Sequence, residues 1–176
     1  FLRPSEFAGD GSPDIEWIDY TLNKLAEDGR EYDCFAILRP TSPFRKAETI
    51  ARAWDKFNSL NNVDSLRAVE LCAQHPAKMW SIQGDTMTPI LPYTNAGIPW
   101  HSSQYPTLPQ IYIQNASLEI AHTRVVTEMG SIAGNVIAPF LTEGDEGLDL
   151  NTELDWDVIE AMIARGDAVL SQIKNS

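Results

Sequence analysis

Two oxygen-bearing side chains, Asp149 and Asn151, stand two positions apart just before an amphipathic segment. In an extended stretch, side chains two positions apart lie on the same face. Hard oxygen ligands on one face, with further carboxylates close behind, suit a Mg²⁺ ion that keeps waters and binds substrate phosphates. The spacing therefore makes Asp149 and Asn151 candidate ligands of a magnesium ion.

The same stretch also fits the start of a helix. Thr152 is followed three positions later by Asp155, which resembles a capping box with Asp in place of the usual Glu. In that interpretation the polar residues satisfy the first N–H groups of the helix and carry no chemistry. Spacing alone leaves both interpretations open.

A second group of candidate residues follows an apolar run. Residues 34–38 (CFAIL) are continuously apolar, which is typical of a strand covered on both faces, as in a parallel sheet. Ligands of such sheets bind at the carboxyl ends of the strands. Arg39, Thr41 and Ser42 fall at that end and are candidate binding residues, although Thr41 and Ser42 also fit a turn that leaves the strand.

The elements that would position these residues alternate between helix and strand. Apolar residues at helical spacing predict three helices, over residues 12–29, 47–60 and 153–173, the last bent or divided at Gly166. Strands or extended segments are predicted over residues 34–38, 65–71, 111–120 and 136–141. This alternation indicates an α/β layered fold. The residues expected to face the core from the second and third helices are Ile50, Ala53, Trp54, Phe57, Leu154, Val158, Ile159 and Met162.

The regular pattern breaks between Met79 and Pro109, a stretch that holds five prolines and two tryptophans. A long irregular segment inside a compact domain is usually functional or docks on a partner. We therefore expect one domain over residues 1–176, from which residues 79–110 protrude as a proline-rich dimerisation arm. Gln104 within the arm is a candidate substrate-binding residue, with an interface or loop role as the alternative.

The formal charge of −12 at pH 7 argues against nucleic acid and anionic membrane as partners, because the chain would repel both. It would also repel a nucleoside triphosphate unless a cation or a local basic patch intervened. The sequence shows no signal peptide and no apolar run near 18 residues, so we expect a cytoplasmic protein.

Several short stretches occur in one order along the chain. They are Phe1–Pro4 (FLRP), Ala8–Asp10 (AGD), Leu38–Arg45 (LRPTSPFR), His75–Trp80 (HPAKMW), Leu108–Pro109 (LP), Gln114–Ser117 (QNAS), Gly130–Gly134 (GSIAG) and Asp149–Trp156 (DLNTELDW). In this order they resemble the acylneuraminate cytidylyltransferases, which activate sialic acids and related nonulosonic acids as CMP-sugars. The resemblance covers essentially the whole chain and rests on the order of many motifs.

The resemblance implies a three-layer α/β nucleotide-diphospho-sugar transferase fold, Rossmann-like, with a mostly parallel sheet, and a homodimer. It implies that CTP and a nonulosonic acid react to give a CMP-sugar and pyrophosphate, with Mg²⁺ as cofactor. The anomeric hydroxyl of the sugar would attack the α-phosphorus of CTP. A displacement of this kind depends on positioning and charge neutralisation, which explains the need for metal and basic groups.

The resemblance also implies roles for single residues. Asp149 matches the first metal-binding aspartate of the family, and Asn151 stands where a second aspartate is usual, as a weaker and neutral ligand. Arg39 replaces a glutamine that contacts the sugar, and a guanidinium can bind a sugar carboxylate through two parallel hydrogen bonds. Lys78 matches a lysine on the sugar side. Asn115 matches the asparagine of the N-G-A-I-Y motif.

Two departures from the family pattern bear on function. Glu119 replaces a tyrosine near the sugar, which indicates a sugar different from the commonest sialic acid. The ten glycines are scattered, and no glycine- and lysine-rich loop of the kind that cradles the CTP phosphates is present. We therefore expect an N-terminally truncated, C-terminal portion of such an enzyme. Two alternatives stay open: an inactive sugar-binding or assembly module, and a sugar nucleotidyltransferase that uses another base.

Overall fold

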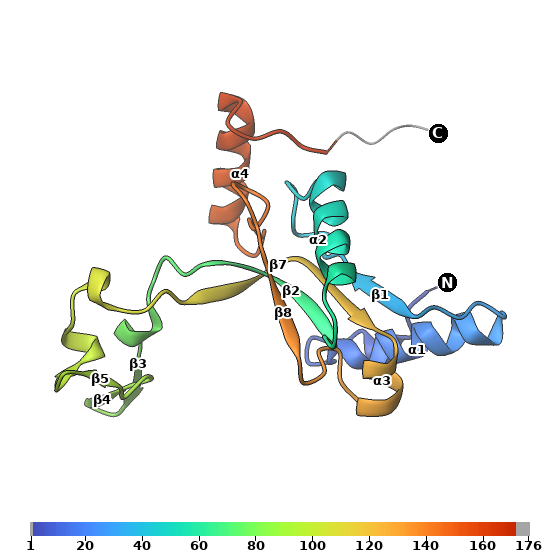
Figure 1. Cartoon of the computed structure of the whole chain (residues 1–176). Helices are drawn as coiled ribbons and strands as arrows, with labels where there is room; N and C mark the ends of the chain where they lie inside the picture. Colours follow the sequence, from blue (N-terminus) through green and yellow to red (C-terminus); the bar gives the residue numbers. More distant parts are fainter. Residues whose placement is uncertain (1, 172–176) are drawn as a thin grey trace. The chain divides into compact units, whose positions relative to one another are not determined.

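The computed structural model describes residues 2–171 (Figure 1). The chain divides into two compact units, one formed by residues 1–69 and 115–176 and the other by residues 70–114. The first unit contains the larger sheet and its covering helices. The second unit contains two small sheets of two strands each.

A four-stranded sheet forms the centre of the first unit. Its strands follow the order β1 (Cys34–Ile37), β7 (Tyr112–His122), β2 (Ser65–Leu71) and β8 (Ile137–Leu141). β1 pairs antiparallel with β7, whereas β2 pairs parallel with β8. β7 also runs against β2, because His122 N donates to Asp64 O at one end and Cys72 N donates to Ile111 O at the other. The prediction of a mostly parallel sheet is therefore wrong. The sheet is mixed, since an apolar run reports the burial of a strand but not its direction.

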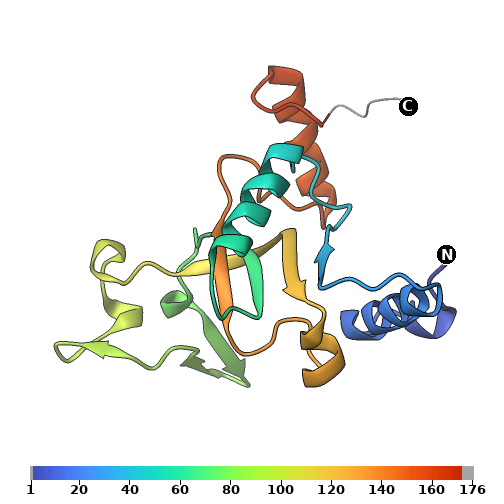
Figure 2. The same cartoon turned by 45° about the vertical axis from the view of Figure 1, so that its right-hand side comes forward.

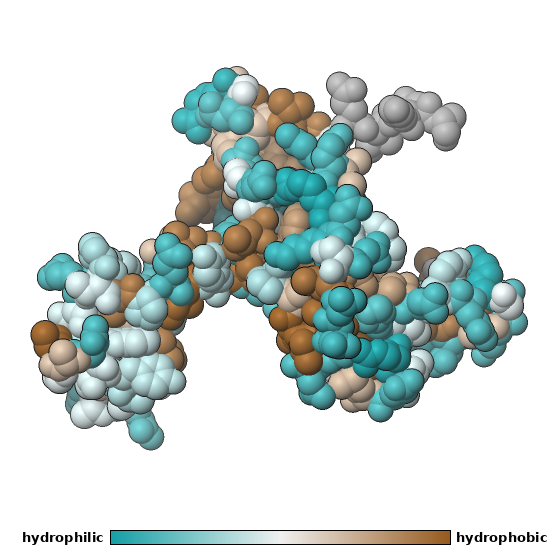
Figure 3. Space-filling model, in the orientation of Figure 1, coloured by the Kyte–Doolittle hydropathy of each residue, from teal (hydrophilic) through white to brown (hydrophobic). Residues whose placement is uncertain are grey.

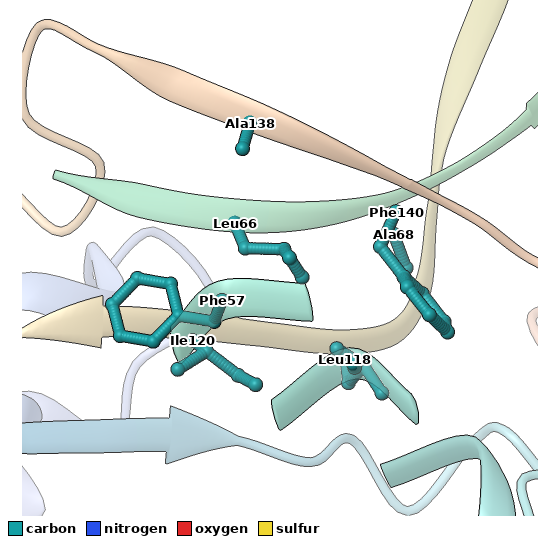
Figure 4. Close-up of a cluster of buried hydrophobic side chains, with 8 residues drawn as sticks. Phe57, Leu66, Ala68, Leu118, Ile120, Ala138 and Phe140 are labelled. Carbon is teal, nitrogen blue, oxygen red and sulfur yellow. The ribbon is translucent and has the colours of Figure 1, made fainter. Parts of the chain in front are cut away.

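Helix α2 (Ala47–Ser59) covers one face of this sheet (Figure 2). Apolar residues at alternate strand positions point to this face and meet the apolar stripe of the helix. The resulting core consists of Ala53, Phe57, Leu66, Ala68, Leu118, Ile120, Ala138 and Phe140, most of them labelled in Figure 4. The predicted inward positions of Ala53 and Phe57 are confirmed, and Ile50 packs against the same core. Trp54, in contrast, is exposed.

The opposite face, at the β1 side, is covered by α1 (Asp14–Glu27) and α3 (Arg124–Met129). The core here consists of Ile18, Ile37 and Val126. Helix α1 is shorter at both ends than the predicted residues 12–29. Ala36 in β1 is exposed, so the apolar run is not covered on both faces as expected.

Helix α4 (Glu153–Arg165) forms a third core cluster through Ile159, which packs with Phe44 and Ala168. The helix ends at Gly166, whose φ of 76° lies in the left-handed region that favours glycine. It does not continue through residues 167–171 as predicted, and the last two predicted positions, 172 and 173, lie outside the described residues. Leu154 and Val158 were expected to face inward but are exposed, and Figure 3 shows apolar surface where α4 lies. Within residues 2–171, no helix combines the length and the apolar character that crossing a membrane requires.

The second unit, residues 70–114, is built from short strands and single turns of 3-10 helix. β3 (Trp80–Gln83) and β4 (Thr86–Pro89) form a hairpin, and β5 (Thr94–Asn95) pairs with β6 (Ile98–Pro99). His75 Nε2 lies 3.0 Å from Pro109 O, so the two ends of the segment are held together. The segment predicted as an arm therefore has regular local structure. Its docking on a partner stays a prediction.

Candidate functional site

The loop after β1 and the acidic segment before α4 lie side by side. Leu150 N donates to Thr41 O at 2.9 Å, which joins two stretches that are more than one hundred residues apart in sequence. The carboxyl end of β1 therefore carries both groups of residues singled out by the sequence. Arg39 and Thr41 belong to the loop after β1, and Asp149 belongs to the segment before α4.

Asp149 and Asn151 contact one another directly. Asn151 Nδ2 donates to Asp149 Oδ2 at 2.7 Å. The other carboxylate oxygen, Asp149 Oδ1, is buried and has no hydrogen-bond partner in the described part of the chain. A buried carboxylate oxygen without a donor is costly, so this atom is poised to accept a ligand.

The helix cap predicted as the alternative is also present. Asp155 N donates to Thr152 Oγ1 at 3.3 Å, and Thr152 N donates to Asp155 Oδ2 at 2.8 Å. Hydrogen bonds from the Asn151 backbone, then from the Thr152 side chain and backbone, hold the pKa of Asp155 below its usual value. The cap uses Thr152 and Asp155 and leaves Asp149 available. The two interpretations therefore do not compete for the same side chains.

The donors at this place suit a cation held mostly by other ligands. Across residues 2–171, no group of three or more His, Cys, Asp or Glu side chains is arranged to hold a metal ion. The unpartnered Asp149 Oδ1 and the amide oxygen of Asn151 are hard oxygen ligands, which Mg²⁺ accepts together with waters and phosphates. The residues therefore fit a magnesium ion that is completed by a phosphate-bearing substrate, and do not form a full protein cage.

Arg39 lies between two carboxylates. It pairs with Asp14 at the start of α1, and its Nη2 is 3.5 Å from Glu119 Oε1. The sheet register explains the second contact, because Glu119 on β7 stands opposite Ile37, two residues before Arg39. The hydrogen bond from Arg39 holds the pKa of Asp14 below its ordinary value, and the same bond raises the pKa of Arg39.

Glu119 is itself fixed by a second arginine. Its Oε2 lies 2.5 Å from Arg67 Nη1, in an ion contact that is not aligned as a hydrogen bond. Both side chains are largely buried, at 7% exposure for Glu119 and 14% for Arg67. Glu119 therefore cannot move toward solvent without breaking this pair. Its position holds Arg39 at the edge of the sheet.

Arg45 fastens the same loop to β7. Its Nη1 donates to Arg39 O at 2.9 Å and to Ser117 O at 2.5 Å. Burial lowers the pKa of Arg45 from its ordinary value. The hydroxyls of Ser42 and Ser117 are buried beside this loop and have no hydrogen-bond partner within residues 2–171. Ser42 is thus held inside the loop, in line with its turn interpretation.

Asn115 also lies on β7, but its side chain is engaged locally. Its Oδ1 accepts from Ser117 N at 3.2 Å, and its Nδ2 donates to Thr142 Oγ1 at 2.9 Å. Asn115, Ser117 and Glu119 alternate along the strand and so share one face of the sheet. That face is opposite to the one covered by α2, because Leu118 and Ile120 point to α2.

Two predicted site residues, Lys78 and Gln104, belong to the second unit. Lys78 Nζ donates to His101 O at 2.8 Å and to Ser103 O at 2.6 Å, and lies over the ring of Tyr105. Gln104 O accepts from Thr107 Oγ1 at 2.8 Å at the start of a 3-10 turn. Both residues therefore stabilise the conformation of their own unit.

Sequence reasoning missed Asp14, Arg67 and Arg45 as parts of the site. Asp14 begins a helix and Arg67 sits within a strand, so neither stands in a motif. The available signal was indirect: Arg67 stands between apolar residues in a predicted strand, which indicates a buried charge partner.

Comparison with known proteins gives one informative relative. No model of a known protein family matches the chain. The chain is 29% identical over 166 residues to a CMP-N,N'-diacetyllegionaminic acid synthase from Legionella pneumophila subsp. pneumophila. The match covers 93% of this chain and 68% of that protein. This similarity supports a relationship with the nonulosonic acid cytidylyltransferases. The mixed α/β architecture around a sheet is consistent with a nucleotidyltransferase fold.

Proposed function

We propose that this chain is a nonulosonic acid cytidylyltransferase, which transfers CMP from CTP to a nonulosonic acid and releases pyrophosphate. The observation that carries the proposal is the hydrogen bond between Leu150 N and Thr41 O, which brings Arg39 and Asp149 to one edge of the sheet. The match to a CMP-nonulosonic acid synthase over 93% of the chain supports the same reaction.

The residues at this edge have complementary roles in the proposed reaction. Arg39 binds the carboxylate of the sugar acid through its planar guanidinium, and Thr41 and Ser42 shape the loop that carries it. Asp149 and Asn151 hold Mg²⁺, which would neutralise the phosphate charge that develops in the displacement. Glu119, fixed by Arg67, keeps the Arg39 guanidinium in place.

Asn115, on β7 in the first unit, is proposed to bind the sugar as well. For Lys78 and Gln104 the same role is proposed on the resemblance alone, because their contacts lie within residues 70–114. The same unit, with exposed apolar side chains such as Ile82 and Met87 on its β3–β4 hairpin, is proposed to mediate a homodimer.

The proposal is tested by pyrophosphate release with CTP, Mg²⁺ and a panel of nonulosonic acids. Replacing Asp149 by Asn removes the charge that faces the proposed metal, and we expect turnover to fall by about a hundredfold or more. Asp157→Asn is the matched control, since Asp157 is exposed on α4 and lies outside the site. Equal turnover in the two variants would contradict the proposed metal role of Asp149.

One observation favours a second candidate function, a non-catalytic sugar-binding module of the same fold. Asn151 turns its amide nitrogen toward Asp149, so the cluster offers a single negative charge to a cation. Binding of a nonulosonic acid without pyrophosphate release at any Mg²⁺ concentration would favour this module. Turnover with a triphosphate other than CTP would favour a nucleotidyltransferase of different base specificity.

A further inference from the structure

The two carboxylates on Arg39 differ in their freedom to move. Glu119 is buried in the middle of β7 and is tied to Arg67 at 2.5 Å. Asp14 is the first residue of α1, and its side chain is 27% exposed. One partner of Arg39 is therefore fixed, and the other can leave the guanidinium toward solvent.

We propose that Asp14 occupies the position of the substrate carboxylate on Arg39, and that a sugar acid binds only by displacing Asp14. This inference rests on the proposed function, because it takes Arg39 as the group that binds the acid. Asp14 thereby becomes a specificity-determining residue: a ligand must bring its own carboxylate to replace it.

Repulsion between carboxylates supports the exchange. Arg39 already has two carboxylates beside it, those of Asp14 and Glu119. A ligand carboxylate on the same guanidinium would stand next to both, and like charges at such short range repel one another. Releasing Asp14 removes one of these two charges and frees its place on the guanidinium for the ligand carboxylate.

Asp14 has further partners besides Arg39. Trp17 Nε1 donates to Asp14 Oδ1 at 2.9 Å, one turn along the same helix. The N-terminal turn of a helix favours a negative charge. Arg3 adds a further attraction for the Asp14 carboxylate and lies over the ring of Trp17. Asp14 can therefore turn away from Arg39 without losing all of its stabilising contacts.

The test compares Asp14→Asn with the original chain. Asparagine keeps an oxygen that accepts from Trp17 but gives up the charge that holds Arg39. We expect the dissociation constant for N,N'-diacetyllegionaminate, the sugar acid in the name of the Legionella relative, to fall about threefold to tenfold when it is measured by titration calorimetry. Where turnover is present, the KM for the sugar acid should fall while the KM for CTP stays the same. A purely structural role of Asp14 would not produce this division.

Two controls separate the exchange from a general charge effect. Asp19→Asn makes the same change on the same helix, at a residue that pairs only with Asn23 among the described contacts, and should leave the affinity unchanged. The methyl ester of N,N'-diacetyllegionaminate carries no carboxylate, so Asp14→Asn should not improve its binding. Asp14→Ser also removes the charge and should tighten binding of the acid in the same way, which provides an independent test if Asp14→Asn does not fold.

The outcomes distinguish this inference from the proposed function. Tighter acid binding in Asp14→Asn without pyrophosphate release in either protein would support the exchange and contradict the cytidylyltransferase reaction. Pyrophosphate release with equal or weaker acid affinity in Asp14→Asn would overturn the exchange and leave the reaction standing. Absence of acid binding in both proteins would overturn the exchange as well.

Discussion

The buried pair between Glu119 and Arg67 provides the sharpest test of how the site is held together. Replacing Glu119 by Gln keeps the size and one acceptor oxygen but leaves Arg67 without its counter-ion. The exposures of 7% and 14% leave little solvent to screen the lost charge. Removing one partner of a buried ion pair typically costs 3–5 kcal/mol, and the retained acceptor places this change near the lower end, at about 3 kcal/mol.

For a chain of this size, about 3 kcal/mol corresponds to a fall in melting temperature of roughly 6–12 °C. Differential scanning calorimetry and urea unfolding should give the same order of destabilisation. The matched control is Glu128→Gln, the same chemical change at an exposed position on α3, which should have little effect.

A double variant tests the physical reason. Combining Glu119→Leu with Arg67→Met removes both charges and replaces them by apolar side chains of similar size. We expect this variant to be more stable than Glu119→Gln, because no unpaired charge is left buried. The reasoning would be refuted if Glu119→Gln melted together with Glu128→Gln, or if the double variant were the least stable of the three.

Two other predictions concern stability alone. Thr152→Ala removes the side-chain cap of α4 and should lower the free energy of unfolding, measured in urea, by about 1 kcal/mol. Any turnover should be kept, because the cap is separate from Asp149. Loss of turnover with unchanged stability would contradict that separation. Asp64 accepts hydrogen bonds from Val136 N and Asn135 N and pairs with Arg124, which together depress its pKa in the folded state. A depressed pKa adds stability that is complete above the unfolded-state pKa and is lost as pH falls through the folded-state pKa. The difference in melting temperature between the original chain and Asp64→Asn should therefore be large at pH 7 and shrink toward pH 3, and a constant difference would contradict the assignment.

Elements with a clear apolar period could be predicted from the sequence. The strand over residues 65–71 is present with those bounds, and the helix over residues 47–60 ends one residue early, at Ser59. The strand buries alternate apolar residues and the helix buries one apolar stripe, so the spacing of apolar residues in each segment follows directly from its packing. Helix α3 (Arg124–Met129) was missed, because six residues are too few for a period to show.

The strand direction and the charge cluster could not be predicted from local patterns. The antiparallel pairing of β7 with β1 joins residues as distant as 34 and 122, and no local pattern in the sequence specifies such a distant partner. Arg39 meets Asp14 and Glu119 for the same reason: each comes from a different element, and only the sheet order brings them together. The contact between the β1 loop and the Asp149 segment places both groups of candidate residues at the carboxyl end of β1, and ligand binding there stays a prediction.

The arrangement of the two units along the chain also sets an order for folding during synthesis. The unit of residues 70–114 is continuous, and its β3–β4 hairpin pairs residues only a few positions apart, so it can form soon after it leaves the ribosome. The other unit is interrupted by it. β1 cannot pair until β7 has been synthesised, because Cys34 pairs with His122. β2 likewise cannot complete its parallel pairing until β8 has been synthesised. The nascent chain therefore carries the exposed edges of β1 and β2 until the later strands arrive, and this interval is when chaperones would be needed most.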